Sequence, residues 1–167
     1  MAIVSKEVLK PQDIKSIKIY VSQMTFGIAG KIQDPRTGLE AKFSQQYCVA
    51  NALLRGDTGI RAFTDEKVND PKIRKFMKRI SVALDEKLTK LEERVEIEVE
   101  SGAKYTKTWD VRKEIPEIRS KRAKVEDKYI DVCSSVLGKR KTKHLMELIL
   151  SLEKLDNMKE FIEQVGI

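Results

Sequence analysis

The sequence predicts an α+β fold, with a mostly antiparallel sheet that carries helices on one face and is followed by C-terminal α-helices. Residues 16–21 and 95–100 alternate apolar and polar side chains, as strands with one solvated face do. Between them apolar residues recur at helical spacing, and from Pro116 the composition changes to helix formers. We therefore expect an α+β domain in residues 1–115 and a helical segment in residues 116–167.

Length and composition indicate an ordinary globular protein. The 167 residues suffice for one domain with a proper core, or for a domain with an appendage. Hydrophobic residues make up 41% of the chain and charged residues 35%. No apolar run approaches the ~20 residues needed to cross a bilayer, and the first residues lack the apolar core of a signal peptide. These features predict a cytoplasmic protein with no membrane partner.

The residues that could bind metal are few and scattered. Cys48 and Cys133 both fall on apolar helix faces, which fits small hydrophobic side chains in a reducing compartment better than a disulfide. The only histidine is His144, and neither cysteine has a neighbouring ligand at metal-binding spacing. We expect neither a metal nor a cofactor.

The formal charge of +7 raises the question of a polyanionic partner. Basic residues form three clusters: Lys72, Arg74, Lys75, Lys78 and Arg79; Arg119, Lys121, Arg122, Lys124 and Lys128; and Lys139, Arg140, Lys141 and Lys143. Each cluster is interleaved with apolar positions and lies near acids, so solvated helix faces are favoured over attraction of a small polyanionic substrate. No aromatic-rich strand or known motif supports a nucleic-acid partner.

Residues 16–21 form the first predicted strand, with Ile17, Ile19 and Val21 on one face. The segment from Met24 to Ile32 contains two glycines and no clear period. We expect it to be the extended end of the strand and a loop.

A helix from about Leu39 to Arg55 is the centre of the predicted fold. Asp34, Pro35 and Gly38 predict a turn before it, and Gly56 is placed to end it. One stripe of this helix holds large and small apolar groups: Phe43, Tyr47, Ala50 and Leu54. A second stripe holds only small side chains: Ala41, Ser44, Cys48 and Ala52. A helix buried on two faces must satisfy its Ser, Tyr and Asn side chains, which makes it the best candidate for a site.

The elements of residues 64–111 follow from caps and alternation. Thr64 can cap a short helix, and Asp70-Pro71 predicts the start of a helix that buries Ile73, Phe76 and Met77. Ile80, Val82 and Leu84 predict a strand, whereas Val95, Ile97 and Val99 alternate with Glu96, Glu98 and Glu100 in the next. Ser101-Gly102 turns the chain into a last strand from Tyr105 to Val111, with Trp109 as a packing anchor.

Helices are expected from Pro116 onward. Two apolar stripes precede a last helical turn. The first stripe consists of Val125, Tyr129, Val132, Cys133 and Val136, and the second consists of Leu145, Leu148, Ile149, Leu152 and Leu155. Gly138 should stop the first helix, and Asp156 can cap a turn that buries Met158, Phe161, Ile162 and Val165. These apolar faces have no obvious partner in the chain, which predicts a homo-oligomer, most simply a dimer.

Several short motifs together carry a family resemblance. They are Phe43-Ser44-x-x-Tyr47-x-Val49-Ala50-x-Ala52-Leu53, then Gly56, then Phe63-Thr64, then Asp70-Pro71-x-Ile73. From about Ile14 to its C-terminus, the chain resembles the second half of the MmgE/PrpD family. This family includes 2-methylcitrate dehydratase, cis-aconitate decarboxylase and iminodisuccinate epimerase.

The resemblance implies a lid-like α+β domain from about Ile14 to Lys113, followed by helices that return to a large helical domain. It implies a hydro-lyase of propionate metabolism that acts on a small di- or tricarboxylate. The chain begins just after the family's central Lys and His positions, so it should be inactive without a helical half, which could be separately encoded. The runner-up interpretation is a non-catalytic homo-oligomeric domain that has kept the fold only.

The resemblance also names the candidate site residues. It implies that Tyr47 is catalytic and points into the cleft between lid and helical domain, where a phenol can donate to an oxygen without adding negative charge. Ser44 could orient a substrate carboxylate or only cap a backbone carbonyl, and Tyr47 could instead be a core aromatic with a satisfied hydroxyl. Lys42 stands where an uncharged side chain is expected, and residues 112–116 replace a glycine- and proline-rich connection.

Overall fold

The computed structural model describes residues 9–114, 117–155 and 157–165 of the chain. The chain divides into two compact units, Met1–Glu114 and Ile115–Ile167. Unit 1 is an α+β structure whose four-stranded sheet has the order β2-β1-β3-β4. Its strands are β1 (Ile14–Val21), β2 (Ile80–Leu84), β3 (Glu92–Val99) and β4 (Lys104–Asp110). The predicted α+β fold is confirmed, with one parallel pair, β1 with β2, in an otherwise antiparallel sheet.

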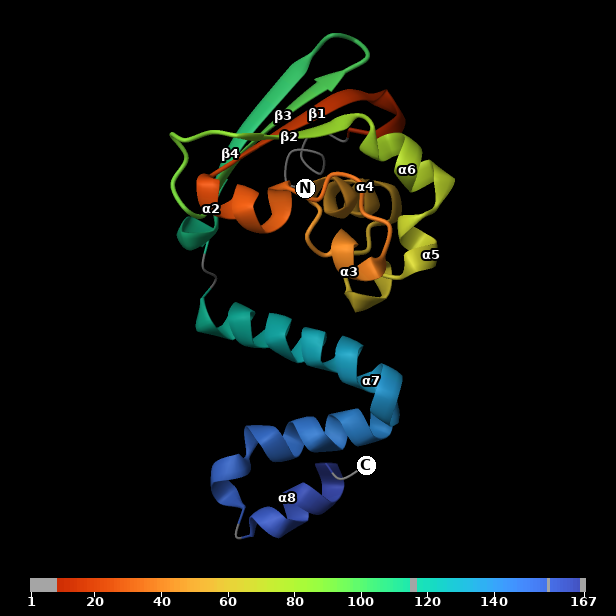
Figure 1. Ribbon diagram of the computed structural model, residues 1–167. Helices are drawn as coiled ribbons and strands as arrows, with labels where there is room; N and C mark the ends of the chain where they lie inside the picture. Colours follow the sequence, from red (N-terminus) through yellow and green to blue (C-terminus); the bar gives the residue numbers. More distant parts are fainter. Residues whose placement is uncertain (1–8, 115–116, 156, 166–167) are drawn as a thin grey trace. The chain divides into compact units, whose positions relative to one another are not determined.

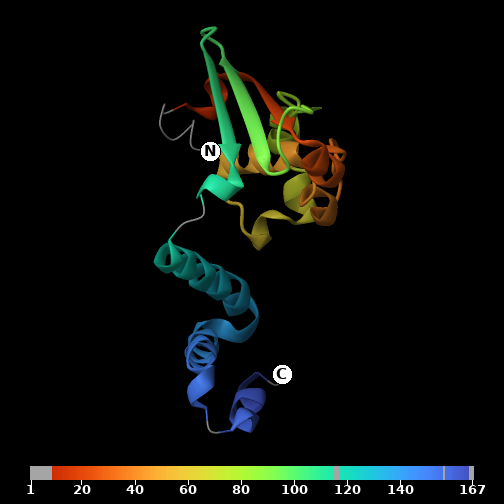
Figure 2. The same cartoon turned by 90° about the vertical axis from the view of Figure 1, so that its left-hand side faces the viewer.

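One face of the sheet is buried by helices and the other is solvated. Ile17 and Ile19 of β1 are about 1% exposed, whereas Lys18 between them is exposed. The helices of unit 1 lie on the apolar face (Figures 1 and 2). On the open face Lys15 of β1 pairs with Glu98 of β3 at 2.7 Å. The strand alternation read from the sequence thus separates a core from a charged surface.

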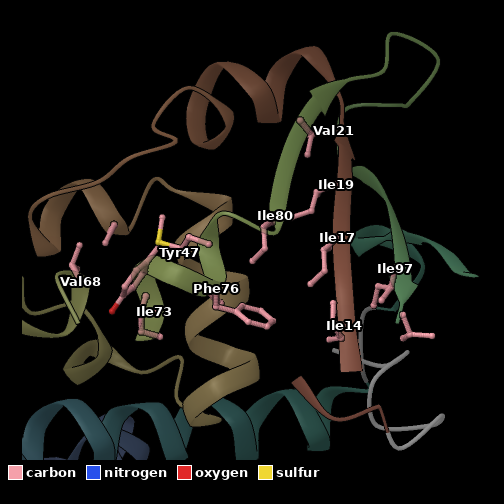
Figure 3. Packing of buried hydrophobic residues seen from close by; sticks show 14 residues of the cluster. Ile14, Ile17, Ile19, Val21, Tyr47, Val68, Ile73, Phe76, Ile80 and Ile97 are labelled. Atoms are coloured by element: carbon pink, nitrogen blue, oxygen red, sulfur yellow. The ribbon is translucent and has the colours of Figure 1, made fainter. Parts of the chain in front are cut away.

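Short helices with well-defined caps form the second layer of unit 1. They are α2 (Gln23–Thr25), α3 (Gly38–Ala41), α4 (Gln45–Arg55), α5 (Asp65–Val68) and α6 (Pro71–Met77). Thr64 caps α5 and Asp70 caps α6, as predicted from the sequence. Helix α4 packs against both α6 and β2. Together with the apolar face of the sheet, these helices enclose the core of unit 1 drawn in Figure 3.

Two sequence predictions in this layer are wrong. The segment predicted as extended and loop is helical, because the Ser22 hydroxyl caps α2 and a π-helix, Phe26–Gly30, continues it. The helix predicted from Leu39 to Arg55 is two helices. Thr37 and Glu40 form a capping box for α3, and Ser44 then starts α4 with extended backbone angles.

Unit 2 contains α7 (Ile118–Leu150) and α8 (Met158–Val165). Gly138 interrupts α7 with a φ of 74°, so the predicted stop at this glycine is confirmed as a break between two helical segments. The predicted burial in the last turn is wrong: Met158, Ile162 and Val165 are 47%, 63% and 45% exposed. The predicted cap, Asp156, lies outside the described residues. No helix in the described ranges has the length and apolarity to cross a membrane.

Candidate functional site

Ser44 is the N-cap of α4. Its hydroxyl accepts a hydrogen bond from the Tyr47 backbone N–H at 3.4 Å, and the residue is only 1% exposed. An N-cap hydroxyl satisfies one of the donors that the first turn of a helix leaves free. The geometry supports a capping role for Ser44, but the group that it caps is a backbone N–H and not the backbone carbonyl considered from the sequence.

Tyr47 lies on the inner side of α4, in the core of unit 1. The residue is 0% exposed, and Figure 3 shows its ring with Val68 and Ile73 on the helical side of the core. Its hydroxyl donates a hydrogen bond to the Ala62 carbonyl, and its ring packs against Phe63 with centroids 5.8 Å apart. Burial raises the pKa of the Tyr47 hydroxyl, which keeps the donor protonated. In this arrangement the phenol joins α4 to the segment around residue 62.

The polar side chains at the other end of α4 are also satisfied internally. Asn51 is 1% exposed; its amide nitrogen donates to the Asp57 carbonyl, and its amide oxygen accepts from Arg55. Arg55 in turn pairs with Asp70, the N-cap of α6, at 2.5 Å. These contacts tie the C-terminal end of α4 to the start of α6. The serine, tyrosine and asparagine that marked this helix as a site therefore all have partners within unit 1.

Gln46 is the exception on α4, and the sequence analysis missed it. The residue is 3% exposed, yet its side-chain Oε1 is buried without a hydrogen-bond partner in the described part of the chain. Gln46 lines a cavity of about 230 Å³, which we call the Gln46 cavity. The other lining residues are Gln33, Asp34, Arg74, Met77, Lys78 and Ile80. The signal that could have identified Gln46 from the sequence is its position as a polar residue between the two buried stripes of the helix.

Arg74 is held in place on one wall of the Gln46 cavity. Its guanidinium donates to the Pro35 carbonyl at 2.7 Å and also pairs with Asp34. Desolvation opposes the charged form of Asp34, but hydrogen bonds from Arg74 and Arg36 outweigh it and lower the pKa of this carboxyl group. The ion pair places one positive and one negative side chain next to each other on this wall of the cavity.

Glu93 is a second carboxylate that the sequence analysis did not single out. It occupies β3 in register with Val21 and Trp109, and its Oε1 accepts a hydrogen bond from the Gln45 side chain at 3.0 Å. Burial raises the pKa of Glu93, and the bond from Gln45 opposes that rise only in part. Glu96 and Glu98, in contrast, accept bonds from Tyr20 and Lys15. The glutamates of β3 thus occupy two different environments.

We expect Glu93→Gln to stabilise the protein at pH 8 and to have little effect at acid pH. A carboxyl group whose pKa is raised on folding contributes stability below its unfolded pKa and loses it as pH rises through the folded value. Glutamine keeps an acceptor for Gln45 and removes the buried charge. Urea unfolding at several pH values measures the difference.

Glu98→Gln is the matched control, with the opposite sign. The hydrogen bond from Lys15 lowers the pKa of Glu98, so its ionised form stabilises the fold above the unfolded pKa and this contribution disappears on acidification. Glu98→Gln should therefore lower stability at pH 8. The assignment of Glu93 to a desolvated position would be contradicted if both variants showed the same sign at pH 8.

Within the described ranges, no three His, Cys, Asp or Glu side chains come together as a possible metal site. Both cysteines are free and half-buried. Burial raises the pKa of the Cys48 thiol, whose Sγ lies 3.6 Å from the Ala41 carbonyl oxygen. His144 is exposed on α7, in unit 2. None of these side chains joins Ser44 and Tyr47 in a common site within unit 1.

The sequence of the chain matches a model of a known protein family. The family model for the MmgE/PrpD C-terminal domain matches residues 1–154. It therefore covers unit 1 and most of unit 2. No curated protein matches the chain. The motifs that carry the resemblance, in residues 43–73, lie inside the matched range.

Proposed function

Since the chain belongs to the MmgE/PrpD family, we propose that it forms the C-terminal part of a lyase that acts on small di- or tricarboxylates. The observation that carries the proposal is the match to the family's C-terminal domain over residues 1–154. The reaction type, loss of water as in 2-methylcitrate dehydratase, follows from the resemblance of the motifs in residues 43–73.

The chain is proposed to need a helical half for turnover. Dehydration beside a carboxylate requires one group that removes a proton and another that protonates the departing hydroxyl. Tyr47 and Ser44 are buried and bonded within unit 1, and the only histidine, His144, lies in unit 2. The groups that transfer protons would therefore come from the helical half, on the same or a separate polypeptide.

In this proposal Tyr47 and Ser44 act mainly by shaping α4. The bond from Tyr47 to the Ala62 carbonyl favours an anchoring role, and the catalytic role of Tyr47 stays a prediction. Ser44 supports the first turn of the same helix. A substrate carboxylate would then be held by neighbouring groups that the correct placement of α4 brings into position.

Co-expression tests whether the chain recognises a helical half. The full chain carries an affinity tag, and the partner is the N-terminal helical domain of an MmgE/PrpD enzyme from the same genome. We expect the two proteins to purify together in equal amounts, and light scattering should give the mass of two copies of each, because the chain is proposed to form a dimer. An unrelated helical bundle of similar size serves as the control. Failure of the two halves to co-purify, with both folded by circular dichroism, would contradict the proposed assembly.

We also propose that unit 2 pairs with a second copy to form a dimer. Its exposed apolar residues support this: Ile118, Val125 and Val136 are 86%, 61% and 76% exposed. Closed twofold symmetry is the common way to cover an apolar face with its copy. These exposed positions test an interface more cleanly than Leu148, which is half-buried within the unit.

Val125→Glu and Val136→Glu should each convert the dimer to monomer, because a carboxylate buried in an apolar interface lacks a partner. Light scattering over a range of protein concentrations measures the change. Lys124→Glu, at an exposed position next to Val125 on α7, is the control and should leave the dimer intact. A dimer that persists in both valine variants would place the interface elsewhere.

A further inference from the structure

We propose that α7 opens at Gly138 and exchanges its second segment, residues 139–150, with that of a second copy of the chain. In the exchanged dimer the first segment, residues 118–137, binds the second segment of the partner in place of its own. Both segments belong to unit 2. The inference rests on the dimer proposed above and names how the two copies join, but it does not depend on lyase activity.

The two segments of α7 already pack on each other within one chain. They run in opposite directions on either side of Gly138 (Figure 1). Val125 of the first segment and Leu150, the last residue of the second, line one cavity of about 330 Å³. The second segment has a covered face, on which Thr142 and Leu145 are 0% and 3% exposed. The closed hairpin therefore defines the surface that receives residues 139–150.

An exchanged pair keeps the contacts of the closed hairpin. Glu126 and Leu150 line the same cavity and lie twelve residues before and twelve residues after Gly138. When α7 is straight, a twofold axis at Gly138 places residue 150 of one copy beside residue 126 of the other. Each position before Gly138 then meets the same position after it as in the hairpin. The exchange therefore needs no new complementary surface.

Gly138 is the hinge that converts the hairpin into one straight helix. It is the single residue of α7 with non-helical angles, whereas connections between helices usually have about 2–8 residues. Its φ of 74° and ψ of 155° lie in a region that is essentially restricted to glycine. Short hinges of this kind favour exchange between copies. Straightening the hinge continues the helical hydrogen bonds through residue 138, and the 33 residues of α7 then span about 50 Å.

Cross-linking of the full chain distinguishes exchange from the pairing of closed hairpins. Lys121→Cys and Leu150→Cys place thiols at two residues that line the same cavity, and Cys48→Ser and Cys133→Ser remove the native thiols. A short bis-maleimide then joins positions 121 and 150. The monomer at low concentration should give chains linked to themselves, whereas the dimer should give pairs of chains linked to each other. Denaturing electrophoresis and mass spectrometry separate the two products.

Gly138→Ala should lower the Kd of the dimer at least about tenfold. Alanine is disfavoured at a φ of 74° and favours a continuous helix, so the substitution destabilises only the closed hairpin. A Cβ at Gly138 meets no atom within 4 Å, so the backbone angle and not a clash causes the effect. Ser135→Ala, at an exposed position of the first segment, is the matched control and should leave the Kd unchanged. Light scattering over a range of protein concentrations measures each Kd.

Insertion of three glycines after Gly138 tests the opposite direction. A longer connection relaxes the closed hairpin and interrupts the straight helix, so the Kd of the dimer should rise at least about tenfold. The insertion alters neither segment. It therefore decides the question even if Gly138→Ala does not fold.

Three results would overturn the proposal. A dimer whose chains are linked only to themselves would rule out exchange and leave the dimer proposed above intact. Absence of a dimer at any concentration would contradict both proposals. An equal Kd for the wild-type chain, Gly138→Ala and the glycine insertion would show that Gly138 is not the hinge of the dimer.

Discussion

Replacing Tyr47 with alanine should lower the free energy of unfolding of unit 1 by about 3–5 kcal/mol, because it removes a large aromatic ring from a packed core. Tyr47 is fully buried, and its neighbours in the cluster include Val68, Ile73 and Phe76 (Figure 3). Few other single changes remove as much packed volume from this core. Urea unfolding followed by circular dichroism measures the loss.

Tyr47→Phe separates the hydroxyl from the ring. If the hydroxyl is bonded inside the core, the variant leaves the Ala62 carbonyl without its donor and costs about 1–3 kcal/mol. A hydroxyl that faced an open cleft would give less than about 1 kcal/mol, and the anchoring role would then be wrong. Tyr105→Phe is the control: the Tyr105 side chain has no hydrogen bond with described residues, so its change should stay within about 0.5 kcal/mol.

Gly38→Ala should destabilise unit 1 by about 3 kcal/mol or more, because the added methyl group would overlap backbone rather than a flexible side chain. A Cβ at Gly38 would meet the carbonyl oxygen of Phe63 well inside contact distance. Gly38 also donates its N–H to the Asp65 carboxylate at 2.7 Å. The overlap would therefore push the start of α3 away from the start of α5. Thermal and urea unfolding measure the effect.

Gly27→Ala is the matched control for this prediction. A Cβ at Gly27 has no atom within 4 Å, and the glycine lies in the π-helix, where alanine is the better residue. The variant should be neutral or more stable. If Gly38→Ala were as well tolerated as Gly27→Ala, the close approach of residues 38 and 63 would be contradicted.

The sequence predicted correctly those elements in which the local sequence signal, such as alternation or a helix cap, agrees with the burial of the side chains in the structure. Alternation marked β1 and β3, and Asp70-Pro71 marked the start of α6. The two failures in the helical layer of unit 1 have a common cause. Single hydroxyl caps start α2, which the π-helix of Phe26–Gly30 continues, and α4, and a search for apolar periodicity does not weigh such caps. In unit 2 periodicity predicted burial at Ile162, which is 63% exposed.

The candidate site was predictable only in part. Ser44 and Tyr47 came from the resemblance of short motifs, and the structure places both in α4 or at its cap. Gln46 and Glu93 were missed because the properties that single them out, a missing hydrogen-bond partner and a loss of solvent, arise only when the chain folds. Gln46 lacks a hydrogen-bond partner among the described residues, and Glu93 loses solvent. Neither property follows from residue type or spacing.

Turnover of 2-methylcitrate tests the central proposal, that this chain is the C-terminal part of a carboxylate lyase, most directly. The purified chain is assayed alone and after addition of the helical half, and the alkene product is followed by its ultraviolet absorbance. The chain alone should give no product above the rate without protein, and the two halves together should give turnover. Product formation by the contaminant-free chain alone, or an inactive mixture of two folded halves that bind each other, would contradict the proposal.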